Sequence, residues 1–264
     1  MSESEASAPG AARPFADRVR SVPTAAPFDW LAAGWRDFRA AGWASFGYGL
    51  IFVVVGLALA AALFAADMIY LFFPLASGFV LIAPALAIGF YVISRDLEQG
   101  IRPSLGRALR GWLGNAGPLF YAGLALLLLL LLWLRLAQLL FALCFEDAVG
   151  PDPQALLAAT LLTPGGLTFL VLSVAIGAVM AALAFAGAAV ALPLLLDRQA
   201  GMVEAVATSW TAVAMNLPAM IVWAAIIVVL CVVGMAAGFV ALAVTLPLAG
   251  HATWHAYRAT VRPP

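Results

Sequence analysis

Five long runs of the chain carry almost no ionisable side chains. They cover residues 45–66, 69–93, 119–134, 168–196 and 217–250. Each run reaches or nearly reaches the roughly 20 residues that a helix needs to cross the hydrocarbon core of a bilayer. The chain of 264 residues is 65% hydrophobic and 10% charged, and a water-soluble core cannot hide so much apolar surface. The sequence therefore predicts an integral membrane protein built from helices.

The last apolar run is too long for one crossing. As a single helix, at about 1.5 Å per residue, it would be about 51 Å long, whereas the hydrocarbon core is about 30 Å thick. We expect a turn at the segment GMAAG, residues 234–238, which leaves two short spans at about 217–233 and 239–254. Six transmembrane helices result, in a single domain over residues 28–262.

The first 27 residues differ in composition from the rest. They are rich in Ala, Ser, Pro and charge, and they contain no apolar core of the kind found in signal peptides. We expect residues 1–27 to form a disordered cytoplasmic tail.

The arginines orient the expected spans. All 13 basic residues are arginines, and with six spans 12 of them fall on one side of the membrane. These are Arg13, Arg18, Arg20, Arg36, Arg39, Arg95, Arg102, Arg107, Arg110, Arg198, Arg258 and Arg262. The positive-inside rule places that side, with both termini, in the cytoplasm. The opposite connections carry only the acidic residues Asp67, Glu146, Asp147 and Asp152.

Arg135 is the exception to this distribution. It comes late in the third expected span and therefore near the outer surface. There its guanidinium either extends to the interface or pairs with Glu146 or Asp147.

Three similar segments precede the odd-numbered spans. They are WLAAGWRDFRAAGW (30–43), SLGRALRGWLGNAGP (104–118) and VEAVATSWTAVAMNLP (203–218). Each predicts an amphipathic helix at the membrane surface, where tryptophan is favoured. The expected fold is all-α, with three helical hairpins in a pseudo-threefold repeat of units at about 28–95, 103–198 and 202–258. The alternative is that Trp and Arg collect at this interface without a repeat.

Tryptophans and arginines of the expected cytoplasmic side form the candidate binding surface. They are Trp35, Arg95, Arg102, Arg107, Arg110, Trp112, Trp210, Trp254 and Arg258. Such a surface suits a partner protein of a membrane complex, and it also suits anionic lipid headgroups. A solvated set of helix ends is the alternative for the charged segment that begins at Arg95.

The segment HATWHAYR, residues 251–258, holds both histidines of the chain. On a helix His251, Trp254, His255 and Arg258 share one face, and two histidines at this spacing can bind one metal ion. No further histidine is present to complete a metal or haem site, so we expect a polar stripe at the membrane interface and no metal or cofactor. Cys144 and Cys231 are expected to be free thiols, with a disulfide at the outer side as the alternative.

Several segments resemble a known family. WLAAGWRDFRAAGWASFGYGL, LIAPALAIGFYVISRDLEQG and HATWHAYR are similar to bacterial integral membrane proteins of the domain of unknown function family 2189. The resemblance extends from about Phe28 to Val261. It implies a multi-pass inner-membrane protein and brings no established activity.

The motifs of common enzyme classes do not occur in the sequence. There is no Gly-Lys-Ser/Thr phosphate loop, no Cys-x-x-Cys pair and no His-Glu-x-x-His helix. The middle of each span also lacks the ionisable groups that ion and proton carriers use. We expect a scaffold or accessory subunit that is not an enzyme and does not bind nucleic acid. A transporter or channel for a small neutral or lipid-like solute is the alternative, because span prolines can open a pocket.

Overall fold

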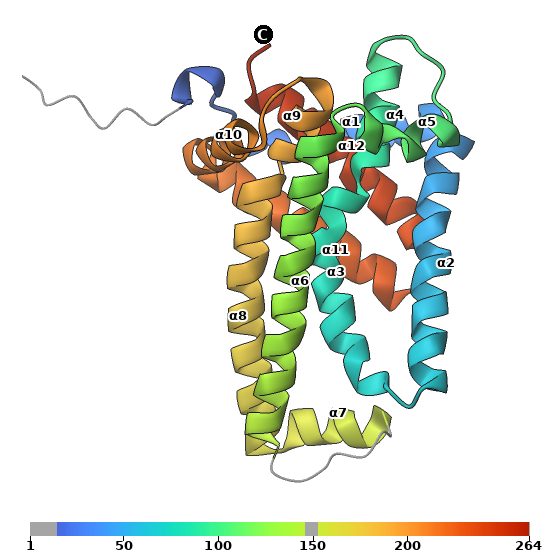
Figure 1. The fold of residues 1–264 in the computed structure, drawn as a ribbon, viewed down its shortest axis with the longest axis vertical. Coiled ribbons are helices and arrows are strands. Elements are labelled where there is room, and N and C mark those ends of the chain that lie inside the picture. Colours follow the sequence, from blue (N-terminus) through green and yellow to red (C-terminus); the bar gives the residue numbers. More distant parts are fainter. Residues whose placement is uncertain (1–14, 146–152, 264) are drawn as a thin grey trace, which may run out of the picture.

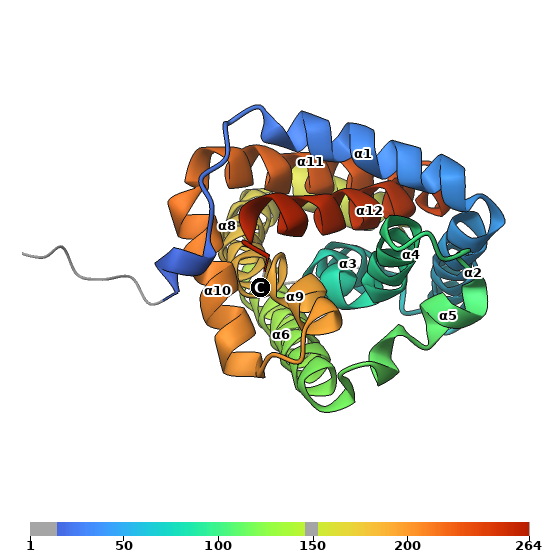
Figure 2. The same cartoon turned by 90° about the horizontal axis from the view of Figure 1, so that it is seen from above.

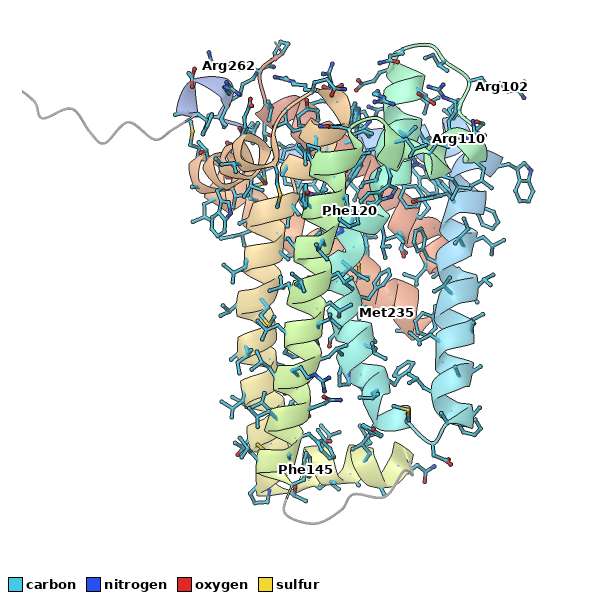
Figure 3. All side chains as sticks on the ribbon, viewed as in Figure 1. Arg102, Arg110, Phe120, Phe145, Met235 and Arg262 are labelled. Carbon is cyan, nitrogen blue, oxygen red and sulfur yellow. The ribbon has the colours of Figure 1, made fainter. Side chains whose placement is uncertain are left out.

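The computed structural model describes residues 15–145 and 153–263. Every regular element in this part of the chain is a helix, and one isolated β-bridge joins Val19 to Val261. Long helices stand side by side over most of the height, and short helices gather at one end with the C-terminus (Figure 1). We call this the arginine-rich end because Arg102, Arg110 and Arg262 lie there, and we call the opposite end, at Phe145, the far end (Figure 3). The all-helical fold expected from the sequence is confirmed.

Five stretches of the described chain are long and apolar enough to cross a membrane. They are α2 (Trp43–Ala65), α3 with α4 (Phe72–Leu86 and Ile88–Glu98), α6 (Ala116–Cys144), α8 with α9 (Pro164–Ala188 and Ala191–Asp197), and α11 (Leu217–Ala236). Each contains most of one of the five apolar runs, because continuous apolar sequence favours a helix whose backbone groups are all bonded within it.

Prolines accompany the two interruptions in these stretches. Pro84 lies in the last turn of α3, and α4 starts two residues after α3 ends. Proline has no amide hydrogen to donate to the preceding turn, so a helix bends or stops near it. Pro193 lies in the first turn of α9, directly after the break that ends α8. Both bends lead short polar-ended helices, α4 and α9, into the arginine-rich end (Figure 1).

The last two helices form an oblique hairpin. α11 is joined to α12 (Leu242–Thr260) by a turn in which Gly238 and Phe239 have positive φ angles of 65° and 66°. The predicted turn at residues 234–238 is therefore displaced by about one helical turn. Met235, near this turn, lies between the two ends of the molecule and well short of Phe145 (Figure 3). α12 holds the sixth expected span but is not among the five apolar stretches, so six crossings stay a prediction.

Short helices cover the arginine-rich end. They are α1 (Ala26–Ala41), α5 (Leu105–Leu109), the 3-10 turn η3 (Gly111–Leu113) and α10 (Met202–Met215). The three segments expected to be surface helices fall here, although residues 104–118 form a short helix and a turn instead of one helix. Seen from above, α1 runs alongside α12 (Figure 2). Gly34 of α1 is buried and faces the backbone of Ala252, so the two helices approach closely.

The described part of the expected tail, residues 15–25 before α1, contacts the rest of the fold. Val19 is buried and forms its bridge with Val261, and the amide of Arg20 donates to the carbonyl of Thr260 at 2.8 Å. Asn216, between α10 and α11, accepts a hydrogen bond from the amide of Val22 at 2.8 Å. Composition alone could not predict these contacts, because the pairing partners lie about 200 residues away in the sequence.

Two expected segments lie wholly or partly outside the described residues. Residues 1–14 of the expected cytoplasmic tail are one, and residues 146–152 of the expected outer loop are the other, so the predicted roles of Glu146, Asp147 and Asp152 are not described. α7 (Pro153–Leu162) lies across the far end (Figure 1). Arg135 is exposed near this end and donates to the side chain of Gln138 at 3.2 Å. Cys144 and Cys231 are free thiols.

Candidate functional site: an exposed arginine–tryptophan surface over a buried polar network

His251 of α12 is fully buried between two serines. Its Nε2 lies 2.7 Å from the hydroxyl of Ser45 on α2, and its Nδ1 lies 2.9 Å from the hydroxyl of Ser94 on α4. Ser94 in turn donates to the carboxylate of Asp37 on α1 at 2.6 Å. These four side chains connect four helices, two of which lie near the beginning of the chain and one at its end.

The hydrogen positions follow from this geometry. A carboxylate only accepts hydrogen bonds, so the single hydroxyl hydrogen of Ser94 goes to Asp37. Ser94 must therefore accept from His251, which places the imidazole hydrogen on Nδ1 and leaves Nε2 to accept from Ser45. A neutral His251 satisfies every one of these bonds. Because Ser45, Ser94 and His251 are all completely buried, this Ser-His-Ser-Asp series holds helices together and offers a substrate no access.

Asp37 also binds the second histidine. Nε2 of His255 lies 2.8 Å from the same carboxylate oxygen that accepts from Ser94. Burial raises the pKa of the Asp37 carboxyl, but the hydrogen bonds from His255 and Ser94 outweigh burial and lower that pKa below its ordinary value. Hydrogen bonds therefore connect His251 to His255 through Ser94 and the Asp37 carboxylate. Among the described residues no three His, Cys, Asp or Glu side chains gather in a metal-binding arrangement.

The next turns of α12 extend the network toward solvent. Trp254 donates from Nε1 to Glu98 of α4 at 3.0 Å, and the Arg258 guanidinium lies 3.3 Å from Glu98 and 3.5 Å from Asp197 of α9. The hydroxyl of Tyr257 donates to Asp197 at 2.6 Å. Burial and this contact with a negative charge raise the pKa of the Tyr257 phenol. α12 is therefore fixed to α4 and α9 by charged hydrogen bonds, which are stronger than neutral ones.

The interfacial stripe expected on α12 is an internal face. His251 and Trp254 are completely buried, and His255 is half-buried, while Arg258 alone of the four is exposed. The helical spacing predicted correctly that these residues share one side of the helix. It could not show that α1 and α4 cover this side. Trp254 consequently does not lie on the exposed surface where we expected it.

Three arginines of the candidate surface mainly connect elements. Arg107 of α5 binds the fully buried carboxylate of Asp96 through two hydrogen bonds of 2.6 and 2.7 Å. This contact raises the pKa of the Arg107 guanidinium. Arg95 donates to the carbonyl of Leu196 at 2.9 Å, which joins α4 to α9. Each of these arginines, Arg95, Arg107 and Arg258, therefore has a partner within the molecule.

Other arginines at the same end are exposed and have no acidic partner among the described residues. They are Arg20, Arg36, Arg39, Arg102, Arg110 and Arg262. Large apolar side chains are also exposed on α1, which carries Arg36 and Arg39, and at the start of α2, notably Trp35 and Trp43, the latter 82% exposed. We call these six arginines with Trp35 and Trp43 the arginine–tryptophan surface. Arg102, Arg110 and Arg262 mark its extent in Figure 3.

The other two expected tryptophans have different surroundings. Trp210 of α10 is 45% exposed at this end, while Trp112 is half-buried with its ring against Gly123 of α6. Sequence reasoning missed Asp37, Ser45 and Ser94, because each is a common surface or helix residue when seen alone.

Two asparagines that the sequence analysis did not single out anchor loops. Asn115 and Asn216 stand directly before α6 and α11. The Asn115 side chain donates to the carbonyls of Leu195, Arg198 and Ala200, and the Asn216 side chain donates to the carbonyl of Arg20 at 3.0 Å. Their signal in the sequence is their recurrence shortly before a proline, in NAGP and NLP.

Residues 72–197 match the model of a family described as a predicted integral membrane protein, DUF2189. Over this part the chain is similar to the DUF2189 family. The DUF2189 match runs from the start of α3 to the end of α9, so it includes the Arg107–Asp96 pair and leaves out α1, α2 and α12. It is shorter than the resemblance over residues 28–261. With the apolar helices, it confirms that the protein is an integral membrane protein. No curated protein and no solved structure matches the chain.

Proposed function

We propose that the protein is a non-enzymatic scaffold or accessory subunit of a membrane complex, and that its arginine–tryptophan surface binds an acidic partner. One observation carries this proposal. At the arginine-rich end the buried acidic groups are already paired, whereas six exposed arginines have no acidic partner among the described residues. Exposed arginine beside exposed tryptophan is the composition enriched at protein interfaces. Anionic lipid headgroups are the second ligand that this surface suits.

We propose that the arginine-rich end faces the cytoplasm of a bacterial inner membrane. The positive-inside rule supports this orientation, since 12 of 13 arginines fall on one side in the expected topology. Both α1 and the C-terminus lie at this end (Figure 1). This agrees with two cytoplasmic termini whether the α11–α12 hairpin completes its crossing or turns within the bilayer.

We also propose that the element order records three copies of one unit. α1 precedes the hairpin of α2 with α3–α4, α5–η3 precedes that of α6 with α8–α9, and α10 precedes that of α11 with α12. The parallel roles of Asn115 and Asn216 at the starts of α6 and α11 support a common origin. In the third unit the hairpin lies obliquely. We include in this proposal that α11 and α12 are the fifth and sixth membrane crossings.

We also propose that the buried Ser45–His251 pair is not catalytic. The buried Ser45–His251 pair has the groups of a hydrolase nucleophile and base, but a catalytic nucleophile must reach its substrate. Both residues have no exposed surface, and the hydrogen bonds of His251 are already satisfied. A structural role accounts for the whole network.

Purification in mild detergent from the native membrane tests the scaffold proposal. We expect a defined set of membrane proteins to co-purify with the wild type and to be lost from the charge-reversal variant Arg36→Glu/Arg39→Glu. Arg135→Glu at the far end is the matched control, and it should retain them. Unchanged co-purification with the α1 variant would contradict the proposal. Loss of bound phosphatidylglycerol in native mass spectra, with no protein partner in the wild type, would assign the surface to lipid.

A further inference from the structure

An apolar cavity of about 350 Å³ lies between α2, α3 and the α11–α12 turn. Its walls come from one side of α2, from Ile51 to Leu63, and from α3, with Leu130 of α6 and Phe239 of the turn closing it. Every lining side chain is a hydrocarbon except the thioether of Met235. The cavity is thus separate from the polar network and from the arginine–tryptophan surface.

The oblique course of the last hairpin explains why this space exists. The turn between α11 and α12 inserts the ring of Phe239 against Gly56 of α2 and beside Phe72 of α3, with ring centroids 6.0 Å apart. α2 packs on α12, α5 and α4 toward the arginine-rich end and continues to the far end beyond the turn. Val55 and Leu59 line the cavity and yet remain 57% and 45% exposed, so the cavity opens sideways between the helices.

We propose that this cavity binds the hydrocarbon chain of a membrane lipid. The lining offers no hydrogen-bond donor and no charge, so a polar ligand would lose its hydration without compensation. An empty space of this size also forfeits the dispersion contacts of its lining, and apolar cavities take up apolar ligands instead of water. The volume falls in the range of about 300–1,000 Å³ found for ligand sites. The molecules that surround a membrane-spanning helix at this depth are lipid chains.

The cavity runs along the helices. Leu63 and Phe72, at the two ends of the α2–α3 connection, line one end of it, and Ile51 of α2 and Leu86 of α3, nearer the arginine-rich end, line the other. A bound chain therefore lies lengthwise between α2 and α3. A site of this kind does not depend on the partner proposed for the opposite end.

Photo-crosslinking in nanodiscs tests this site. The full chain is placed in phosphatidylethanolamine and phosphatidylglycerol with a small share of a phospholipid that carries a diazirine near the end of one acyl chain. After irradiation we expect adducts to concentrate on the lining residues of α2, α3 and the α11–α12 turn. Two filling variants, Ala60→Phe on α2 and Ala76→Phe on α3, should each lower these adducts several-fold. Ala58→Phe, on the exposed side of α2 and outside the lining, is the matched control and should leave them unchanged.

Two results would overturn the site. One is an even spread of adducts over all lipid-facing helices of the wild type, including α8. The other is an unchanged adduct pattern in filling variants that elute as monodisperse protein. The wild-type pattern decides the question even when neither filled variant folds.

Discussion

Gly34 is the position at which one added methyl group should do the most damage to the arginine-rich end. A Cβ atom at Gly34 would lie 2.7 Å from the backbone nitrogen of Ala252 and 3.0 Å from its Cα and Cβ. Two of these atoms belong to the α12 backbone and the third is a Cβ fixed to it, so no side-chain rotation can relieve the contact. Gly34→Ala therefore requires α1 to move away from α12.

The size of the effect follows from two opposing contributions. Overpacking at a closely packed contact costs about 1–3 kcal/mol. Alanine in place of glycine inside a helix returns about 0.5–1 kcal/mol. We expect a net loss of about 1–2 kcal/mol in the free energy of unfolding. For a chain of this size that corresponds to a decrease of roughly 2–8 °C in Tm.

Thermal unfolding in detergent, followed by circular dichroism, measures this change. Gly47→Ala on α2 is the matched control, because the nearest atom to its Cβ would be Leu105 Cδ2 at an ordinary 3.9 Å. That variant should keep or raise Tm. The reasoning would be refuted if Gly34→Ala were as stable as Gly47→Ala. Because α1 also carries Trp35 and Asp37, we expect Gly34→Ala to weaken co-purification of the partner as well.

Three further predictions concern single groups. Arg107→Ala should lower Tm more than Asp96→Asn in the same melting assay, because the first leaves a fully buried carboxylate unpaired and the second removes its charge; the reverse order would contradict the pairing. The lowered pKa of Asp37 means that its ionised form stabilises the fold above its ordinary pKa of about 3.9, and that this contribution is lost as pH falls through the lower folded-state pKa. Asp37→Asn should accordingly melt below the wild type at neutral pH, with the difference shrinking below about pH 4; a constant difference would count against it. A membrane-impermeant maleimide outside intact spheroplasts should label Cys144, which is half-buried at the far end, and spare the buried Cys231. Labelling of Cys144 only after lysis would contradict the proposal that the arginine-rich end faces the cytoplasm.

The sequence predicted the long helices well because their apolar composition alone requires a bilayer. Four of the five apolar runs each became one stretch of helix, and the run 217–250 became α11 and the first part of α12. Pro84 and Pro193 lie close to the interruptions in two of the stretches. The oblique path of α11 and α12 could not be predicted in this way. Apolarity says that a helix lies in lipid, whereas its tilt depends on the neighbours against which it packs.

The candidate site shows a sharper division. The sequence identified the end of the molecule where arginine and tryptophan gather, since the positive-inside rule acts on each residue separately. It did not separate Arg107, which binds Asp96, from Arg102, which has no acidic partner in the described chain. Helical periodicity placed His251 and Trp254 on one face, but it carries no information about which helix covers that face.

At the arginine-rich end, segments from the beginning and the end of the described chain pack together. Val19 pairs with Val261, and α1 packs along α12, whose His251 and His255 it reaches through Asp37. α12 is the least apolar of the long helices, and its polar side chains His251, Trp254, His255 and Tyr257 bond to α1, α2, α4 and α9. Without α12, Asp37 and Ser94 lack their histidine partners and Ser45 lacks its acceptor, and an unpaired buried polar group is costly. We therefore expect α1, with its exposed arginines and tryptophan, to take its final position only after α12 has packed.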